Sequence, residues 1–206
     1  MTSETVRSYD RDAAAYVART ATVPDSVRAA LERLADRLGP GARVLEIGSG
    51  GGRDALLVEQ LGLAVRRTDV TPAFVALLRE QGHPCDLLDP LVDTLSSPDG
   101  PYDAVWANAS LLHVARDDLP TVLDRLAAVT RPGGLLCMSL KEGDGEGWST
   151  HGTINGPRHF TYWRAPDVEA VVRAAGWGDV VVRKGLGGDR GETWLEVSAV
   201  RDGVSP

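Results

Sequence analysis

Glycines gather directly after an apolar run in the stretch VLEIGSGGGRD, residues 44–54. Four of the five positions from Gly48 to Gly52 are glycine, and a backbone without Cβ atoms lets a ligand approach closely. Asp69 follows Gly48 by 21 residues, at the end of the next apolar segment. A carboxylate there can accept hydrogen bonds from both hydroxyls of a ribose. The two features predict a nucleoside-containing ligand at this turn.

The glycine spacing separates two classes of such ligand. Dinucleotide-binding proteins use G-x-G-x-x-G, with the pyrophosphate at a helix N-terminus. Counted from Gly48, the sixth position is Arg53, so the spacing is G-x-G-x-G instead, with Glu46 two residues before it. The only lysines are Lys141 and Lys184, and neither completes a Tyr-x-x-x-Lys pair. A nicotinamide-dependent dehydrogenase is therefore disfavoured.

Alternating strand and helix patterns must position these residues. Apolar periodicity and turn residues predict helices at about 4–20, 24–38, 52–61, 72–81, 117–130 and 165–175. Strands are predicted at 43–48, 64–69, 84–88, 102–108 and 133–141, followed by a hairpin of 177–185 and 192–201 joined by LGGDR. This alternation predicts a parallel sheet covered by helices on both faces, with at least one antiparallel strand. Residues 142–164 are expected to be irregular and are longer than an ordinary loop.

Composition narrows the class of protein. The 206 residues suit one domain, and 43% hydrophobic and 25% charged residues are ordinary for a globular protein. A net charge of −7 without a basic cluster weighs against nucleic acid as a partner. No apolar run reaches the ~18 residues of a membrane span, and the N-terminus lacks a signal-peptide core. Cys85 and Cys137 each lie in an apolar segment, which favours two reduced, buried thiols in a cytoplasmic protein.

The stretch VLEIGSGGGRD resembles motif I of the class I S-adenosylmethionine-dependent methyltransferases. Further segments resemble other motifs of that family, in the same order: SYDRDAAAYV, RRTDVTPAFV, PCDLLDP, YDAVWANASLLHV, LAAVTRPGGLLCMSLKEG and HFTYWRAPDVEAVVRAAGW. The resemblance implies an α/β, Rossmann-like, doubly wound sheet of seven strands in the order 3-2-1-4-5-7-6, with strand 7 antiparallel. It also implies one domain over 1–206, with an N-terminal lid helix within 1–22 and an acceptor-site loop at 142–164.

The resemblance further implies S-adenosylmethionine as cofactor and assigns its contacts. The glycine turn would face the methionine part and ribose, Asp69 the ribose hydroxyls, and Asp86 with the Leu87 backbone the adenine. Glu46 would hold the loop and the methionine amino group, and Arg53 would meet the cofactor carboxylate or form a surface ion pair. The predicted cofactor-binding residues are Tyr16, Glu46, Gly48, Gly50, Gly52, Arg53, Asp69, Val70, Asp86, Leu87, Asn108 and Ala109.

The acceptor site is expected between the lid helix and the loops after the fourth and fifth strands. Its predicted residues are Tyr9, His113, Trp148, Tyr162 and Trp163, and the candidate catalytic residues are His113, His151 and His159. His113 could act as a base or contact the acceptor, or it could be a structural histidine held by hydrogen bonds. Glu142, Asp144 and Glu146 would favour a cationic amine if they face the site, whereas Arg158 and Arg164 would favour a carboxylate. The sequence leaves this choice open.

No metal is predicted, because the position after the fourth strand holds Asn108 where the metal-dependent catechol-type enzymes carry an acid. Methyl transfer needs a base only if the acceptor must lose a proton first. The expected function is therefore O- or N-methylation of a small-molecule acceptor by in-line transfer, with no nucleic acid or membrane partner. The alternative is a non-catalytic regulator that binds S-adenosylmethionine. Oligomeric state stays open.

Overall fold

The computed structural model describes residues 2–152, 154–187 and 191–203. The helices are α1 Ser3–Arg19, α2 Asp25–Leu38, α3 Arg53–Gln60, α4 Pro72–Glu80, the 3₁₀ turn η1 Leu111–His113, α5 Leu119–Val129 and α6 Ala165–Ala174. The strands are β1 Arg43–Ile47, β2 Ala64–Asp69, β3 Cys85–Leu87, β4 Tyr102–Ala107, β5 Thr130–Glu142, β6 Glu146–Ser149, β7 Arg158–Trp163, β8 Trp177–Gly187 and β9 Glu192–Arg201. Every predicted helix and strand is present.

Seven of the strands form the predicted sheet. Their order is β3-β2-β1-β4-β5-β9-β8, with parallel pairing from β3 to β5. Strand β9 runs antiparallel to both β5 and β8. Because β8 and β9 are the sixth and seventh of these strands along the chain, the predicted order 3-2-1-4-5-7-6 is confirmed. Part of the predicted LGGDR turn, residues 188–190, lies outside the described residues.

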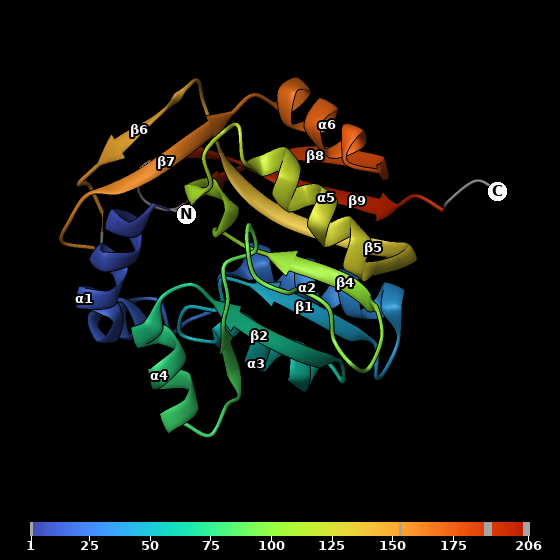
Figure 1. Cartoon of the computed structure of the whole chain (residues 1–206), viewed down its shortest axis with the longest axis horizontal. Coiled ribbons are helices and arrows are strands. Elements are labelled where there is room, and N and C mark those ends of the chain that lie inside the picture. Colours follow the sequence, from blue (N-terminus) through green and yellow to red (C-terminus); the bar gives the residue numbers. More distant parts are fainter. Residues whose placement is uncertain (1, 153, 188–190, 204–206) are drawn as a thin grey trace.

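The expectation that 142–164 is irregular was wrong, because β6 and β7 pair antiparallel as a hairpin there. Lys141 of β5 pairs with Tyr162 of β7 and also with Trp194 of β9. The two partners must therefore lie on opposite edges of β5, which places β7 on the side of β4, beyond the end of that strand. Figure 1 shows the β6–β7 hairpin and α1 beside the carboxyl ends of the parallel strands.

Two apolar cores cover the two faces of the sheet. Because side chains alternate along a strand, Leu136 and Met138 of β5 face α5 and α6, whereas Leu135 faces α2 and α3. Figure 1 shows α5 and α6 in front of the sheet and α2 and α3 behind it.

No helix of the described residues is long and apolar enough to cross a membrane.

Polar contacts hold α1 across the carboxyl edge of the sheet. The Asp10 carboxylate accepts a hydrogen bond at 2.8 Å from the Ala73 backbone N–H, in the first turn of α4. Thr5 accepts one at 2.9 Å from the His159 backbone N–H, and Ser8 donates one at 2.8 Å to the Pro157 carbonyl. Helix α1 is thus fixed between α4 and the β6–β7 hairpin.

Candidate active site

The turn after β1 requires glycine for two different reasons. Gly48, Gly50 and Gly52 have φ of 81°, 52° and 77°, in the left-handed region that side chains disfavour. A Cβ on Gly48 would lie 2.4 Å from Ser110 Cβ, and one on Gly52 would lie 2.5 Å from Leu78 Cδ2. The nearest atom to a Cβ on Gly50 is a Tyr16 ring carbon at 3.7 Å. Gly48 and Gly52 therefore allow close protein packing, whereas Gly50 turns the backbone at the cavity wall.

Asp69 anchors this turn from the end of β2. Its buried carboxylate accepts hydrogen bonds of 2.8 Å from the backbone N–H groups of Gly50 and Thr71. Burial raises the pKa of Asp69, an effect that these hydrogen bonds oppose. The Thr71 side chain and the Val70 backbone N–H also hydrogen-bond to this carboxylate, so a ligand hydroxyl would share its oxygens with the turn.

Asp69 and the glycine turn line a small cavity of about 70 Å³. The rings of Tyr9, Tyr16 and Phe74 pack into it, with centroids 5.5 to 6.0 Å apart. Ligand pockets usually measure ~300–1,000 Å³, so a nucleoside fits only when these rings move apart. The Ser110 hydroxyl at this cavity is buried without a hydrogen-bond partner among the described residues, which suits a polar ligand.

Below the turn, Glu46 is buried and its carboxylate accepts a hydrogen bond from the Ser49 hydroxyl. Burial raises the pKa of Glu46 to about 7, and the Ser49 hydrogen bond opposes the rise. This geometry agrees with the loop-holding role predicted for Glu46. Because its side chain lines neither cavity, the predicted contact with a cofactor amino group stays a prediction.

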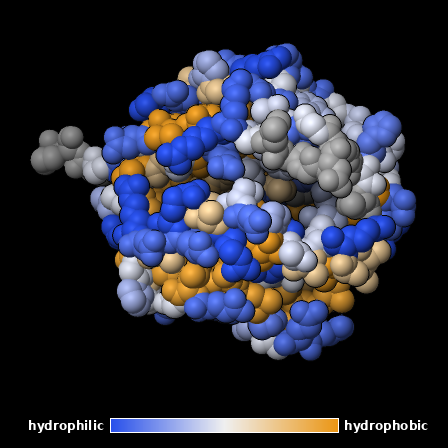
Figure 2. Space-filling model, turned by 180° about the vertical axis from the view of Figure 1, so that it is seen from behind, coloured by the Kyte–Doolittle hydropathy of each residue, from blue (hydrophilic) through white to orange (hydrophobic). Residues whose placement is uncertain are grey.

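A second, larger cavity of about 950 Å³ adjoins the first and shares Tyr9, Tyr16, Ala109 and His113 with it. Its floor is the face of β5, β9 and β8 on the α2 side, and α2 forms a wall. Figure 2 views the molecule from that side and shows the surface hollowed there, with apolar residues among charged ones. The aromatic side chains of α1 thus separate the cavity beside the glycine turn from the one along the sheet.

His113 lies where the two cavities meet, and its protonation state follows from its partners. Its Nδ1 lies 2.6 Å from the His159 backbone carbonyl, which only accepts, so Nδ1 carries the proton. Its Nε2 is then the acceptor for the Tyr9 hydroxyl at 2.9 Å. Burial lowers the pKa of His113 to about 3 and raises that of Tyr9 to about 12. The imidazole is a neutral group whose acceptor nitrogen is already occupied.

Most of the predicted cofactor residues lie at these cavities. Tyr16, Gly48, Gly50, Asp69, Val70 and Ala109 line the small one, and Tyr16, Arg53, Asn108 and Ala109 line the large one. Arg53 donates to the Thr20 and Thr22 carbonyls and pairs with Asp54, so it ties down the end of α1. The Asn108 side-chain NH₂ donates to Asp54 at 2.9 Å, which holds the end of β4 to α3.

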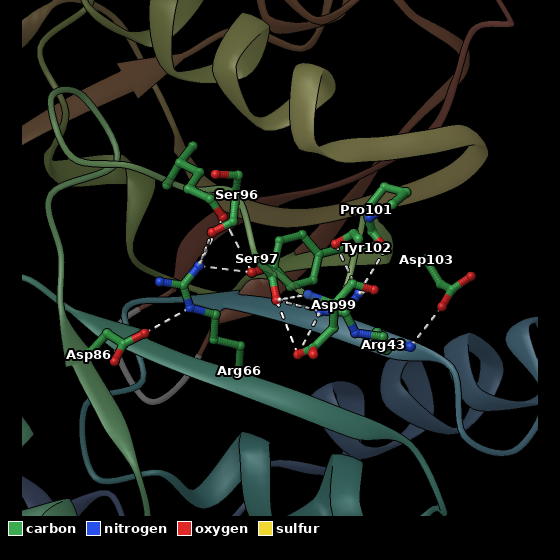
Figure 3. A network of polar contacts seen from close by, with 11 residues as sticks. Arg43, Arg66, Asp86, Ser96, Ser97, Asp99, Pro101, Tyr102 and Asp103 are labelled. Atoms are coloured by element: carbon green, nitrogen blue, oxygen red, sulfur yellow. Dashed lines mark hydrogen bonds and ion pairs between the residues drawn. The ribbon is translucent and has the colours of Figure 1, made fainter.

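The structure does not bring the predicted adenine contacts Asp86 and Leu87 to either cavity. The Asp86 carboxylate pairs with Arg66 at 2.7 Å, and Arg66 also donates to the Tyr102 hydroxyl (Figure 3). The Leu87 side chain is exposed, and neither residue lines a cavity, so the predicted contacts of the Asp86 carboxylate and the Leu87 backbone N–H stay predictions. Because β3 has only three residues, the position just past its end is Leu88, and Asp89 lines the small cavity instead.

Three of the predicted acceptor residues, Trp148, Tyr162 and Trp163, line neither cavity. Trp148 is 54% exposed and packs edge-on against His159 across the hairpin, so the His159 ring also points away. Side chains alternate along β7, so Arg158 and Phe160 lie on the face opposite His159 and line the large cavity, whereas Tyr162, further along that face, packs against Phe160 and does not line it. His151 lines this cavity as well. Sequence reasoning missed Phe160 because it treated 142–164 as a loop without alternation.

Comparison with known proteins extends these observations. Residues 45–138 match a family model described as a methyltransferase domain. A ubiquinone biosynthesis O-methyltransferase of Xanthomonas axonopodis pv. citri is 35% identical over 115 residues, which are 53% of this chain and 47% of that protein. The chain thus spans about half the length of the curated relatives it matches.

Solved structures share the fold. The 1,6-didemethyltoxoflavin-N1-methyltransferase of Burkholderia thailandensis, solved with its substrate and S-adenosylhomocysteine, is 22% identical with a TM-score of 0.70. The alignment covers 96% of this chain and 88% of that one. The [4+2]-cyclase SpnF is 21% identical with a TM-score of 0.63, covering 85% and 80%. The fold therefore serves more than one reaction, as folds commonly do. The family model and the named relatives thus match about half of this chain as a methyltransferase domain, and the solved structures share its fold.

Proposed function

We propose that this protein transfers a methyl group from S-adenosylmethionine to a small-molecule acceptor, at oxygen or nitrogen. The observation that carries the proposal is the pairing of Asp69 with the Gly50 backbone beside a cavity that continues into a second, larger one. Asp69 beside the glycine turn suits a ribose, and the larger cavity leaves room for a second molecule. Curated relatives named O-methyltransferases support the same conclusion.

The residues fit the cofactor in three respects. Asp69 offers acceptor positions for ribose hydroxyls, the Ser110 hydroxyl lacks a partner among the described residues, and Gly50 leaves the cavity wall open. When bound, the cofactor supplies an electrophilic methyl carbon on a sulfonium sulfur. Tyr9 and Tyr16 of α1 line both cavities, so after their rings have moved apart they would contact both reactants, orient them and exclude water.

His113 is poorly suited to act as a general base. A neutral imidazole that accepts from Tyr9 and has a pKa of about 3 binds a proton weakly at neutral pH. Tyr9 has a pKa of about 12 and keeps its proton, which it donates in the hydrogen bond to His113. Its hydroxyl oxygen could therefore only accept a hydrogen bond from the molecule to be methylated. Rate enhancement would then come from orientation and exclusion of water.

A screen of small phenols, amines and carboxylic acids for S-adenosylhomocysteine release tests the proposal. The protein is expected to bind S-adenosylhomocysteine and to release it in turnover with some acceptors. Binding without turnover across a broad screen would support the non-catalytic alternative. Failure to bind S-adenosylhomocysteine would contradict both.

A further inference from the structure

Arg158 is a buried cation at the acceptor-side cavity. It lies on the inner side of β7, is 6% exposed and lines the large cavity. One of its Nη2 hydrogens goes to the His151 carbonyl, and its Nε has no hydrogen-bond partner among the described residues. Among those residues no carboxylate forms an ion pair with it. A buried charge without a counter-ion is costly, so an anionic ligand that pairs with it would recover part of that cost.

The guanidinium lies beside the groups where the two cavities meet. Its central carbon is 5.8 Å from the ring centroid of Tyr9 and 5.2 Å from that of Phe160. Lys141, another cation of this wall, lies over Phe160 but is paired with Glu192 at 3.0 Å. Arg158 is therefore a buried cation of the cavity whose charge no carboxylate of the described residues compensates.

The cavity as a whole is positive although the chain carries a net charge of −7. Among the described residues that line it, six are cationic and three are acidic. These residues are Arg33, Arg37, Arg53, Lys141, Arg158 and Arg183, with Asp179, Glu192 and Glu196. This charge balance attracts an anion rather than a cationic amine.

The acidic residues that would have favoured an amine lie elsewhere. Glu142 pairs with Lys184 at 2.5 Å, Asp144 pairs with Arg164, and Glu146 accepts from the Arg116 backbone N–H at 2.9 Å. None of the three acids lines the large cavity. Two arginines would have favoured a carboxylate. Arg164 pairs with Asp144 and does not line the large cavity, so only Arg158 of the two can meet a ligand there.

We propose that Arg158 binds a carboxylate of the methyl acceptor, so that the acceptor class is a small organic acid. This inference rests on the proposed function. The guanidinium fork matches the two oxygens of a carboxylate, and the flanking rings of Tyr9 and Phe160 suit a planar group attached to it.

Three probes of one size and different charge test the inference: benzoate, benzamide and benzylammonium. Each is titrated by calorimetry into protein saturated with S-adenosylhomocysteine. Benzoate is expected to bind about 10- to 100-fold more tightly than benzamide, the range of a charge-assisted hydrogen bond, and benzylammonium most weakly. Arg158→Met should abolish the preference for benzoate, and Arg158→Lys should keep part of it because it retains the charge but loses the fork.

Arg37→Met is the matched control, because Arg37 lines the same cavity from α2 and its loss should leave the preference unchanged. S-adenosylhomocysteine affinity should be equal in all the variants. A wild-type protein that binds S-adenosylhomocysteine but prefers benzamide or benzylammonium would overturn the inference and leave the proposed function intact, whether or not Arg158→Met folds. A benzoate preference that survives in folded Arg158→Met would also overturn it. A wild-type protein without S-adenosylhomocysteine affinity would overturn the function itself.

Discussion

Gly48→Ala tests whether the turn after β1 packs as closely as the structure shows. Gly48 has a φ of 81°, and an alanine in the left-handed region costs about 1–2 kcal/mol. The new Cβ would also lie 2.4 Å from Ser110 Cβ, next to the backbone, where it cannot be avoided by a side-chain rotation. Overpacking of this kind costs a further ~1–3 kcal/mol. The free energy of unfolding should therefore fall by about 2–5 kcal/mol in total.

Gly82→Ala separates the two costs, because Gly82 has a φ of 83° and no atom within 4 Å of the added Cβ. Its loss should be about 1–2 kcal/mol, the dihedral cost alone. Urea unfolding with the m-value checked measures both variants. The double variant Gly48→Ala with Ser110→Gly removes the clash and should recover the difference. If Gly48→Ala costs no more than Gly82→Ala, or if Ser110→Gly gives no recovery, the close approach of these two segments is refuted.

Four further predictions follow from the site. Asp69→Ala should fold and lose about 1.5–3 kcal/mol of S-adenosylhomocysteine affinity by calorimetry, since it removes charge-assisted hydrogen bonds; unchanged affinity would remove Asp69 from the site. Burial raises the pKa of Glu46 from 4.5 to about 7, so the folded state holds a proton that the unfolded chain releases between these values, and stability from this group falls as pH rises through that window. Glu46→Gln should accordingly match wild type in thermal unfolding at pH 4 and exceed it by at most about 3 kcal/mol at pH 8; equal stability at both would contradict the shift. His113→Ala should change turnover by less than about fivefold with the best acceptor, because its neutral ring is capped by Tyr9, whereas a loss of ~100-fold or more would restore it as a base. Phe160→Leu should raise the KM for the acceptor while Trp148→Leu, on the outer side of the same hairpin, should not, and equal effects would place the acceptor elsewhere.

The sheet and its helices were predictable because each element carries its own local signal. The strand at 43–48 carries the apolar residues Val44, Leu45 and Ile47 and is ended by glycine, and Gly39 and Gly62 follow helices with apolar periodicity. The antiparallel last strand was predictable from the two apolar runs that close the chain. The left-handed glycine turn and the place of Asp69 beside it followed from the same pattern.

The β6–β7 hairpin was not predictable by these signals. Its first strand has four residues, and β7 joins the sheet through Lys141 and Glu142 at the far end of β5, a long-range contact that leaves no local pattern. Without a strand there is no alternation, so nothing could tell that Arg158 faces the cavity and Trp148 does not. Asp86 was assigned to the adenine only through the resemblance of PCDLLDP; in the structure it pairs with Arg66, and Asp89, three residues further on, lines the small cavity.

Calorimetric titration of the protein with S-adenosylhomocysteine, beside NAD as a comparison ligand, tests the central claim most directly. We predict saturable binding of one S-adenosylhomocysteine per chain, weakened at least tenfold by Asp69→Ala, and no binding of NAD. Tight NAD binding would contradict the claim, as would S-adenosylhomocysteine affinity that is absent or indifferent to Asp69.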